Sequence, residues 1–126
     1  MFSHIVIGTD DLEGAKRFYD AALGALGIPA GMIDGRGRVA YAHGGGRLLI
    51  TKPINGDPAC HANGGTIGFA APSPEAVDAW HAAGVAQGGT SCEDAPGWRQ
   101  SPIGRLYLAY LRDPAGNKLC GLYRAP

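Results

Sequence analysis

The residues that most often perform catalysis or bind metals are sparse in this sequence. It contains three cysteines, Cys60, Cys92 and Cys120, together with four histidines. The odd number of cysteines and the absence of a Cys-x-x-Cys spacing argue against a disulfide framework, a zinc ribbon and a dithiol redox pair. Cys60 and His61 are adjacent, but neighbouring side chains on an extended chain point to opposite sides, so we do not expect a Cys–His catalytic dyad.

Cys120 lies in the last apolar segment of the chain, where two interpretations are open. A nucleophilic or redox-active thiol needs a pKa lowered by a nearby cation or a helix N-terminus. His4 could supply that cation if both residues line one cavity. We favour the alternative that Cys120 is a small buried apolar residue without reactivity.

Aromatic residues near the C-terminal strands are candidates for the walls of a ligand pocket. Trp98 and Arg99 belong to the segment 92–105, which has the composition of a long loop and could clamp an aromatic or carboxylate ligand. Tyr107 and Tyr110 are three residues apart on an expected strand, so only one of them can share a face with Cys120.

The first half of the chain alternates between strand and helix patterns. Residues 2–8 are rich in β-branched side chains and end in glycine, which predicts a strand. Asp10 is expected to cap a helix over residues 11–26, with Glu13 reaching back as in a capping box. Two short strands, 39–43 and 47–51, flank a glycine turn, and a further strand is expected near Met32. That turn is not a phosphate loop, because no Gly-Lys-Ser/Thr follows it.

The second half repeats this order. Residues 66–71 read as a strand, Ser73 and Pro74 begin a helix over residues 74–87, and two strands follow at 106–112 and 118–123. An offset of 62 residues places His4 on Thr66 and keeps strand, helix and closing glycine in register, which indicates an internal duplication. Each half reads βαβββ, so we predict an α+β fold whose two half-sheets form one open, incomplete barrel.

Length and charge restrict the class of protein. A chain of 126 residues fits a single domain, here residues 1–126, with one module at about 1–55, a Pro/Gly-rich linker at 52–64 and a second module at about 62–126. Lys and Arg balance Asp and Glu at 11 each, so we expect neither a nucleic-acid nor a membrane partner. No targeting segment is recognisable, and we expect a cytoplasmic protein.

Three segments carry a resemblance to a known family. SHIVIGTDDLEGAKRFYDAALGALG at the start, GGTIGFAAPSPEAVDAWHAAG in the middle and YLAYLRDPAGNKLCGLY at the end resemble the vicinal oxygen chelate superfamily. This superfamily includes glyoxalase I, extradiol dioxygenases and the bleomycin and fosfomycin resistance proteins. The resemblance covers nearly the whole chain and implies the glyoxalase/bleomycin resistance fold, whereas the same scaffold hosts several unrelated reactions.

The resemblance also implies where a metal would bind. Family members that hold a divalent metal usually use His, Gln and Glu from the first and last strands of each half. Those positions fall on His4, on a residue near Leu49, on Thr66 and on Cys120. Leucine has no ligand atom, and threonine and an uncertain thiolate are poor substitutes for imidazole and carboxylate, so we expect no resident cofactor. Among these four positions, only His4 keeps a residue type that the family uses as a ligand. If the protein is instead a metal-dependent enzyme, we expect His4 to bind the divalent metal.

Two functions follow from these expectations. The preferred one is a metal-free cup that binds a small organic molecule, lined by His4, Thr66, Trp98, Tyr107 or Tyr110, and Cys120. The alternative is a metal-dependent lyase, isomerase or dioxygenase of the glyoxalase type, in which the metal acts as a Lewis acid on two adjacent substrate oxygens. Because half-barrels leave sheet edges uncovered, we also expect a homodimer.

Overall fold

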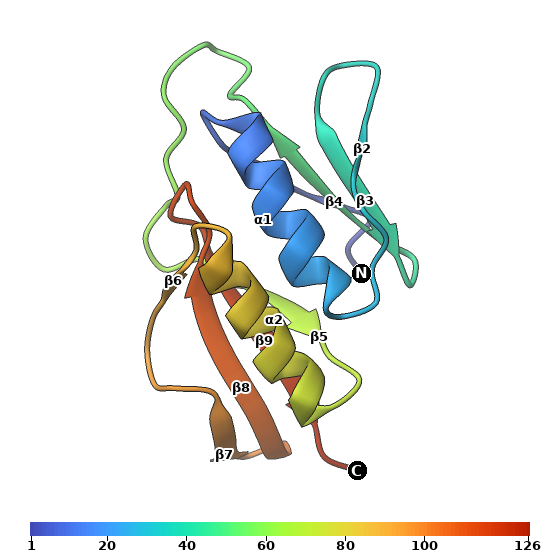
Figure 1. Ribbon diagram of the computed structural model, residues 1–126, viewed down its shortest axis with the longest axis vertical. Helices are drawn as coiled ribbons and strands as arrows, with labels where there is room; N and C mark the ends of the chain where they lie inside the picture. Colours follow the sequence, from blue (N-terminus) through green and yellow to red (C-terminus); the bar gives the residue numbers. More distant parts are fainter.

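The structure, a computed structural model, describes residues 1–126 and contains two helices and nine strands. Two sheets lie against a pair of helices that run side by side (Figure 1). The elements in chain order are β1 (Ile5–Gly8), α1 (Leu12–Gly24), β2 (Met32–Ile33), β3 (Val39–His43), β4 (Gly46–Thr51), β5 (Ile67–Ala70), α2 (Pro74–Ala86), β6 (Thr90–Ser91), β7 (Gly97–Ser101), β8 (Gly104–Arg112) and β9 (Lys118–Arg124).

The two halves of the chain build sheets of the same topology. Sheet one has the order β1-β4-β3-β2, and sheet two has the order β5-β9-β8-β6 with β7 added beside β8. In each sheet the first strand pairs in parallel with the last, and the remaining pairs are antiparallel. The predicted α+β class without a closed barrel is therefore confirmed; the first half has the predicted βαβββ order, and the second half has β7 in addition.

The helix starts show where local sequence decided the structure. Ser73 caps α2 as expected, accepting a hydrogen bond from the Ala76 N–H at 3.1 Å. The prediction that Asp10 caps α1 is wrong by one residue. Asp11 is the cap and accepts from Gly14 N–H, whereas the Asp10 carboxylate accepts the backbone N–H of Ala59 in the linker. Two consecutive aspartates can both cap, and this contact with the linker selects between them.

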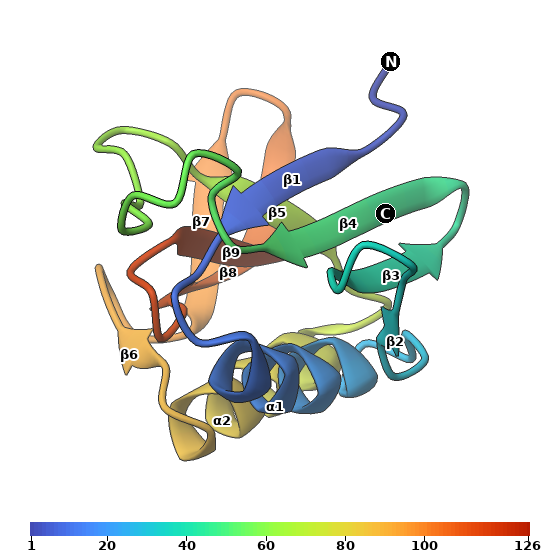
Figure 2. The same ribbon diagram turned by 90° about the horizontal axis from the view of Figure 1, so that it is seen from above.

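Both helices cover the same side of the two sheets, and a single core fills the space between (Figure 2). Tyr19 and Phe18 from α1 and Trp80 from α2 are the three largest fully buried side chains. Tyr19 on α1 donates a hydrogen bond of 2.6 Å to Asp113, which lies in the turn before β9. This bond joins the two modules within the core. Neither helix has the length and apolar character that a membrane crossing requires.

The segment 92–105 is not the long loop expected from its composition. Residues Gly97–Ser101 form β7, which makes a hairpin with β8 through a turn at residues 102–103. The segment is rich in Gly, Pro and charged residues, and this composition predicts a loop. In the structure, cross-strand pairing with β8 stabilises the extended backbone instead.

Candidate functional site

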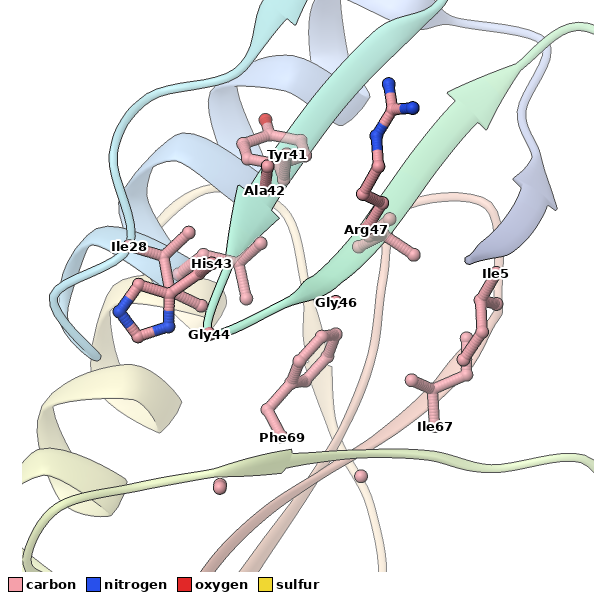
Figure 3. A pocket seen from close by; sticks show the side chains of 14 residues that line it. Ile5, Ile28, Tyr41, Ala42, His43, Gly44, Gly46, Arg47, Ile67 and Phe69 are labelled. Atoms are coloured by element: carbon pink, nitrogen blue, oxygen red, sulfur yellow. The ribbon is translucent and has the colours of Figure 1, made fainter. Parts of the chain in front are cut away.

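A cavity lies between the two modules, and we call it the inter-module cavity. It has a volume of about 460 Å³ and is lined by fourteen residues, nine of them hydrophobic. Ile5 and Leu48 from sheet one, Leu23 from α1 and Ile28 from the loop after α1 form one side. Strand β5 forms the other side, where the Phe69 ring points toward Gly46 and Ile67 points toward Ile5 (Figure 3).

Few polar side chains reach this cavity. The hydroxyl of Tyr41 is already engaged, because it donates to the Asp20 carboxylate at 2.8 Å. His43 lies on the same face of β3 as Tyr41 and takes part in no hydrogen bond, so its imidazole is free to bind a ligand at the mouth of the cavity. The guanidinium of Arg47 extends away from Phe69, although the residue borders the cavity (Figure 3).

The network around Tyr41 fixes the wall next to α1. Asp20 accepts hydrogen bonds from Lys16, from Tyr41 and from the backbone N–H of Gly31. Burial alone would raise the pKa of Asp20, but these donors outweigh it and hold the pKa below its ordinary value. Burial, reinforced by Asp20, raises the pKa of Tyr41, so the phenol stays neutral. Neither Asp20 nor Tyr41 therefore titrates near neutral pH.

Strands β1 and β5 are edge strands that do not pair with each other. Each hydrogen-bonds on one side only, β1 with β4 and β5 with β9. Backbone donors and acceptors on the free side of β5 are therefore open where this strand borders the inter-module cavity. They add hydrogen-bonding capacity to a lining that is otherwise mostly apolar.

His4 and Thr66 occupy equivalent places at the entrances to β1 and β5. Each immediately precedes its strand and is exposed, and neither borders the inter-module cavity; their neighbours Ile5 and Ile67 do. His4 forms a local hydrogen bond with Ser3, 2.8 Å from Nδ1 to the hydroxyl. Ile5 and Ile67 pack against the core beneath the helices. Because side chains alternate along a strand, the neighbouring His4 and Thr66 are turned to the faces that the helices do not cover.

Cys120 and Tyr110 lie opposite one another on β9 and β8, on the helix-free face of sheet two. The thiol is buried. Burial raises the pKa of Cys120, and a hydrogen bond with Tyr110 offsets this only in part. Burial likewise raises the pKa of Tyr110. The pair is therefore protonated at neutral pH, and no cation lowers the thiol pKa enough to make Cys120 a nucleophile.

Trp98 and Tyr107 lie on the opposite face of sheet two from Cys120, so they do not form the walls of a cup that contains this thiol. They pair across β7 and β8, with ring centroids 5.3 Å apart. Arg105 stacks on Trp98 with its guanidinium carbon 4.2 Å from the ring centroid. The Tyr107 hydroxyl donates to Asp78 of α2 at 2.8 Å. The six residues predicted to line one pocket are thus divided between two faces, because Trp98 belongs to a strand rather than to a loop.

The metal ligands that the family resemblance implies do not fit the residues present. Leu49, at the β4 position, is a buried hydrocarbon side chain with 4% exposure. Thr66 offers a neutral hydroxyl and Cys120 a thiol whose pKa is raised. His4 is the single strong ligand among the four positions, and no three His, Cys, Asp or Glu side chains lie together in an arrangement that could hold a metal ion.

Sequence reasoning missed the residues around the inter-module cavity. Ile5, Leu48 and Phe69 belong to ordinary alternating strand patterns, and nothing in their spacing distinguishes a cavity wall from a filled core. The glycine pattern predicts a turn at Gly46, whereas this residue begins β4 and borders the cavity. The one available signal was the small-residue sequence Ala42-His43-Gly44-Gly45-Gly46, which leaves space at the tip of the hairpin.

Comparisons with known proteins agree with this architecture. The family model described as Glyoxalase/Bleomycin resistance protein/Dioxygenase superfamily matches residues 1–120. A crystal structure of a glyoxalase/bleomycin resistance protein from Albidiferax ferrireducens T118 is 58% identical, with a TM-score of 0.95 and coverage of 98% of this chain and 99% of that one. No curated protein matches the sequence significantly.

More distant structures share the fold. Lactoylglutathione lyase from Agrobacterium tumefaciens is 26% identical, with a TM-score of 0.65 and coverage of 98% of this chain and 92% of that one. A glyoxalase-related enzyme from Fulvimarina pelagi is 20% identical, with a TM-score of 0.75 and coverage of 98% and 88%. The family match spans almost the whole sequence, and the chain belongs to the glyoxalase/bleomycin resistance protein/dioxygenase superfamily.

Proposed function

We propose that this protein binds a small, uncharged, largely apolar organic molecule in the inter-module cavity and does so without a resident metal ion. The observation that carries the proposal is the cavity itself. It measures about 460 Å³, nine of its fourteen lining residues are hydrophobic, and its two unengaged polar side chains are His43 and Arg47, of which Arg47 extends away from Phe69. Cavities of this size and character are typical of small-molecule sites, in which a few polar groups orient a mostly apolar ligand.

The chemistry of the four family ligand positions supports the absence of a metal. A divalent metal that activates a vicinal-oxygen substrate needs at least two imidazole or carboxylate ligands besides any third group. Leu49 supplies none, and Thr66 supplies a neutral hydroxyl. The alternative, a metal-dependent lyase, isomerase or dioxygenase, would need ligands from elsewhere in the chain or from a partner.

The lining favours an uncharged ligand. Asp20 is the nearest acid in the network and is saturated by three donors, and Arg47 directs its charge away from the cavity. A charged group placed among Ile5, Ile28 and Phe69 would lose hydration without gaining a partner. A hydroxyl or carbonyl could instead bind the His43 imidazole or the open backbone of β5.

Fluorescence titration with N-phenyl-1-naphthylamine, an uncharged apolar probe, tests the site directly. A Cβ at Gly46 has only the His43 carbonyl oxygen near it, at 3.7 Å, so Gly46→Val is accommodated. Gly46 lies on the same face of β4 as Leu48, which lines the cavity, so the valine side chain extends into the cavity. We expect this variant to weaken probe binding at least about tenfold, equivalent to about 1.4 kcal/mol. The matched control is Gly65→Val, outside the cavity, where a Cβ meets nothing within 4 Å.

The polar contact has its own test. 1-Naphthol should bind more tightly than naphthalene, and His43→Ala should remove that difference while leaving naphthalene binding unchanged. Equal binding of the probe to wild-type protein, Gly46→Val and Gly65→Val would refute the proposed location. Turnover of a vicinal-oxygen substrate that depends on added metal and on His4 would favour the alternative function.

We also propose that the chain forms a homodimer. The free edges of β1 and β5 support this. Exposed apolar side chains also support it: Met32 at 75% and Ile33 at 59% exposure on β2, and Phe2 at 76% ahead of β1. Sedimentation velocity in the micromolar range tests it. A single species with the mass of one chain would refute the dimer.

A further inference from the structure

A second cavity lies on the helix-free face of sheet one, and we call it the basic cavity. Its volume is also about 460 Å³. Six residues line it: Val6, Arg36, Arg38, Thr51, Lys52 and Ile54. The inter-module cavity has no residue in common with it, and the proposal made here does not depend on that cavity or its ligand.

The strand register explains how these residues meet. Val6 and Thr51 lie on β1 and β4 with their side chains turned away from α1, because their neighbours Ile5, Ile7 and Ile50 face the core. Arg38 directly precedes Val39, which pairs with Ile50, so Arg38 lies beside Thr51 at the same end of the sheet. Three chain segments that are distant in sequence thus converge on one place.

The turn between β2 and β3 holds the arginines in position. The Asp34 carboxylate accepts the backbone N–H groups of Arg36 and Arg38 at 2.9 and 3.0 Å, and the Nε of Arg38 at 2.7 Å. The backbone hydrogen bond from Arg38, with the other donors, lowers the pKa of Asp34, so this acid stays ionised at neutral pH. The bond from Nε orients the Arg38 side chain, and its two terminal guanidinium nitrogens make no hydrogen bond.

The charge of the basic cavity is not compensated. Asp34 balances Arg38, but the side chains of Arg36 and Lys52 form no ion pair and no hydrogen bond. No acidic residue lines the cavity. Because the whole chain is neutral at 11 cationic and 11 anionic side chains, this concentration of positive charge is local rather than a consequence of composition.

Apolar groups lie beside these cations. Val6 is 44% exposed and Ile54 is fully exposed, and both border the cavity. The hydroxyl of Thr51 adds a further polar group at its edge. A ligand that matches this lining combines an anionic head group, bound by guanidinium and ammonium donors, with a short apolar portion that covers Val6 and Ile54.

We propose that the basic cavity binds a small organic anion, a carboxylate or a phosphate monoester with an apolar substituent. Arg36, Arg38 and Lys52 bind the head group, and Val6 and Ile54 contact the substituent. A carboxylate and a phosphate share the chemistry that this site recognises, and the probes below distinguish them.

NMR titration of ¹⁵N-labelled protein at low ionic strength tests the proposal with phenyl phosphate, octanoate and inorganic phosphate. We expect phenyl phosphate or octanoate to shift the amide signals of Arg36, Arg38, Thr51 and Lys52 and to bind several-fold more tightly than inorganic phosphate. The stronger of the two organic anions identifies the head group. Arg36→Ala combined with Lys52→Ala should weaken binding roughly tenfold, whereas Arg17→Ala, an exposed arginine on α1, should not change it.

Both substituted residues are at the surface, so the double variant should fold, and its amide spectrum away from the site checks this. Three results would overturn the proposal: no shift at these amides with any probe, equal affinity for phenyl phosphate, octanoate and inorganic phosphate, or unchanged binding in the double variant. Gly46→Val should leave anion binding to the basic cavity unchanged. The experiments therefore distinguish a wrong assignment of the basic cavity from a wrong assignment of the inter-module cavity.

Discussion

Leu49 and Cys120 occupy equivalent positions in the two halves of the molecule. Leu49 lies opposite Val6 in the parallel pairing of β1 with β4, and Cys120 lies opposite Gly68 in the pairing of β5 with β9. The offset between Val6 and Gly68 is the same 62 residues that relates His4 to Thr66. Both side chains are buried, with exposed fractions of 4% and 6%. The duplicated fold thus presents a hydrocarbon and a protonated thiol where family members with a metal use ligands.

Thiol reactivity tests the state of Cys120. Cys60 is exposed, Cys92 is half-buried and Cys120 is buried with a raised pKa, so we expect Cys60 to react first with Ellman's reagent and Cys120 only on unfolding. Cys60→Ser should remove the fast phase. A fast phase that persists in the double variant Cys60→Ser and Cys92→Ser would show that Cys120 is an activated thiol.

The bond between Tyr19 and Asp113 should contribute strongly to stability. Tyr19→Phe removes a buried 2.6 Å hydrogen bond to a carboxylate, so we expect the free energy of unfolding to fall by about 1.5–3 kcal/mol. Tyr107→Phe removes a hydrogen bond to Asp78 at the surface and is the matched control, with an expected loss below about 1 kcal/mol. Urea unfolding measures both. Equal losses would contradict a special role for the buried bond.

The contact between the two helices depends on Gly84. A Cβ there would lie 2.5 Å from Leu111 Cδ1 and 3.1 Å from Phe18 Cε2, both in the buried core. Gly84→Ala should therefore destabilise the protein by about 1–3 kcal/mol. At Gly24, the last residue of α1, a Cβ meets nothing within 4 Å, so Gly24→Ala should be neutral or stabilise by up to about 1 kcal/mol. We expect the thermal unfolding midpoint to fall in Gly84→Ala and to stay the same or rise in Gly24→Ala. An equal fall in both variants would contradict this packing.

His81 should make stability depend on pH. Burial lowers the pKa of His81 below its ordinary value of 6.5, although Asp78 partly opposes this. The folded state therefore binds fewer protons than the unfolded state, so the contribution is complete above pH 6.5 and is lost as the pH falls through the folded-state pKa. His81→Gln should flatten the dependence of unfolding free energy on pH in that range. The same slope in the variant and the wild type would refute it.

The lowered pKa of Asp20 acts in a different range. Its contribution is present above the ordinary value of 3.8 and is lost as the pH falls below that value, so it does not overlap with the histidine. Asp20→Asn should reduce stability at neutral pH and remove the loss at acid pH. If Asp20→Asn still loses unfolding free energy as the pH falls below 3.8, other carboxylates cause that loss.

The fold could be predicted because its signals are local and repeated. Ser73-Pro74 defines the start of α2, alternating apolar residues define the paired strands, and the 62-residue offset joins them into two equal modules. Predictions were wrong where the local sequence allowed two conformations and a tertiary contact stabilised one of them. Ala59 selects Asp11 over Asp10 as the α1 cap, and β8 draws residues 97–101 into a strand.

The site was less predictable than the fold. The 62-residue offset predicts that His4 and Thr66 are equivalent, and each directly precedes the first strand of its half. The offset does not predict the inter-module cavity, which is lined by their neighbours Ile5 and Ile67. The prediction that Trp98 forms a pocket wall depends on a loop at 92–105, whereas the segment forms a strand and the face of a strand residue depends on register. A cavity is a relation between elements distant in the sequence, and no pattern within one element encodes it.

Metal analysis combined with probe titration shows whether this protein binds its ligand without a resident metal. Protein purified with Ni²⁺, Mn²⁺, Fe²⁺ and Zn²⁺ in the medium is analysed for bound metal and titrated with N-phenyl-1-naphthylamine before and after chelator treatment. We expect metal well below one equivalent per chain and the same probe affinity in both samples. One equivalent of metal that is lost in His4→Ala, or probe binding that disappears with the chelator, would contradict it.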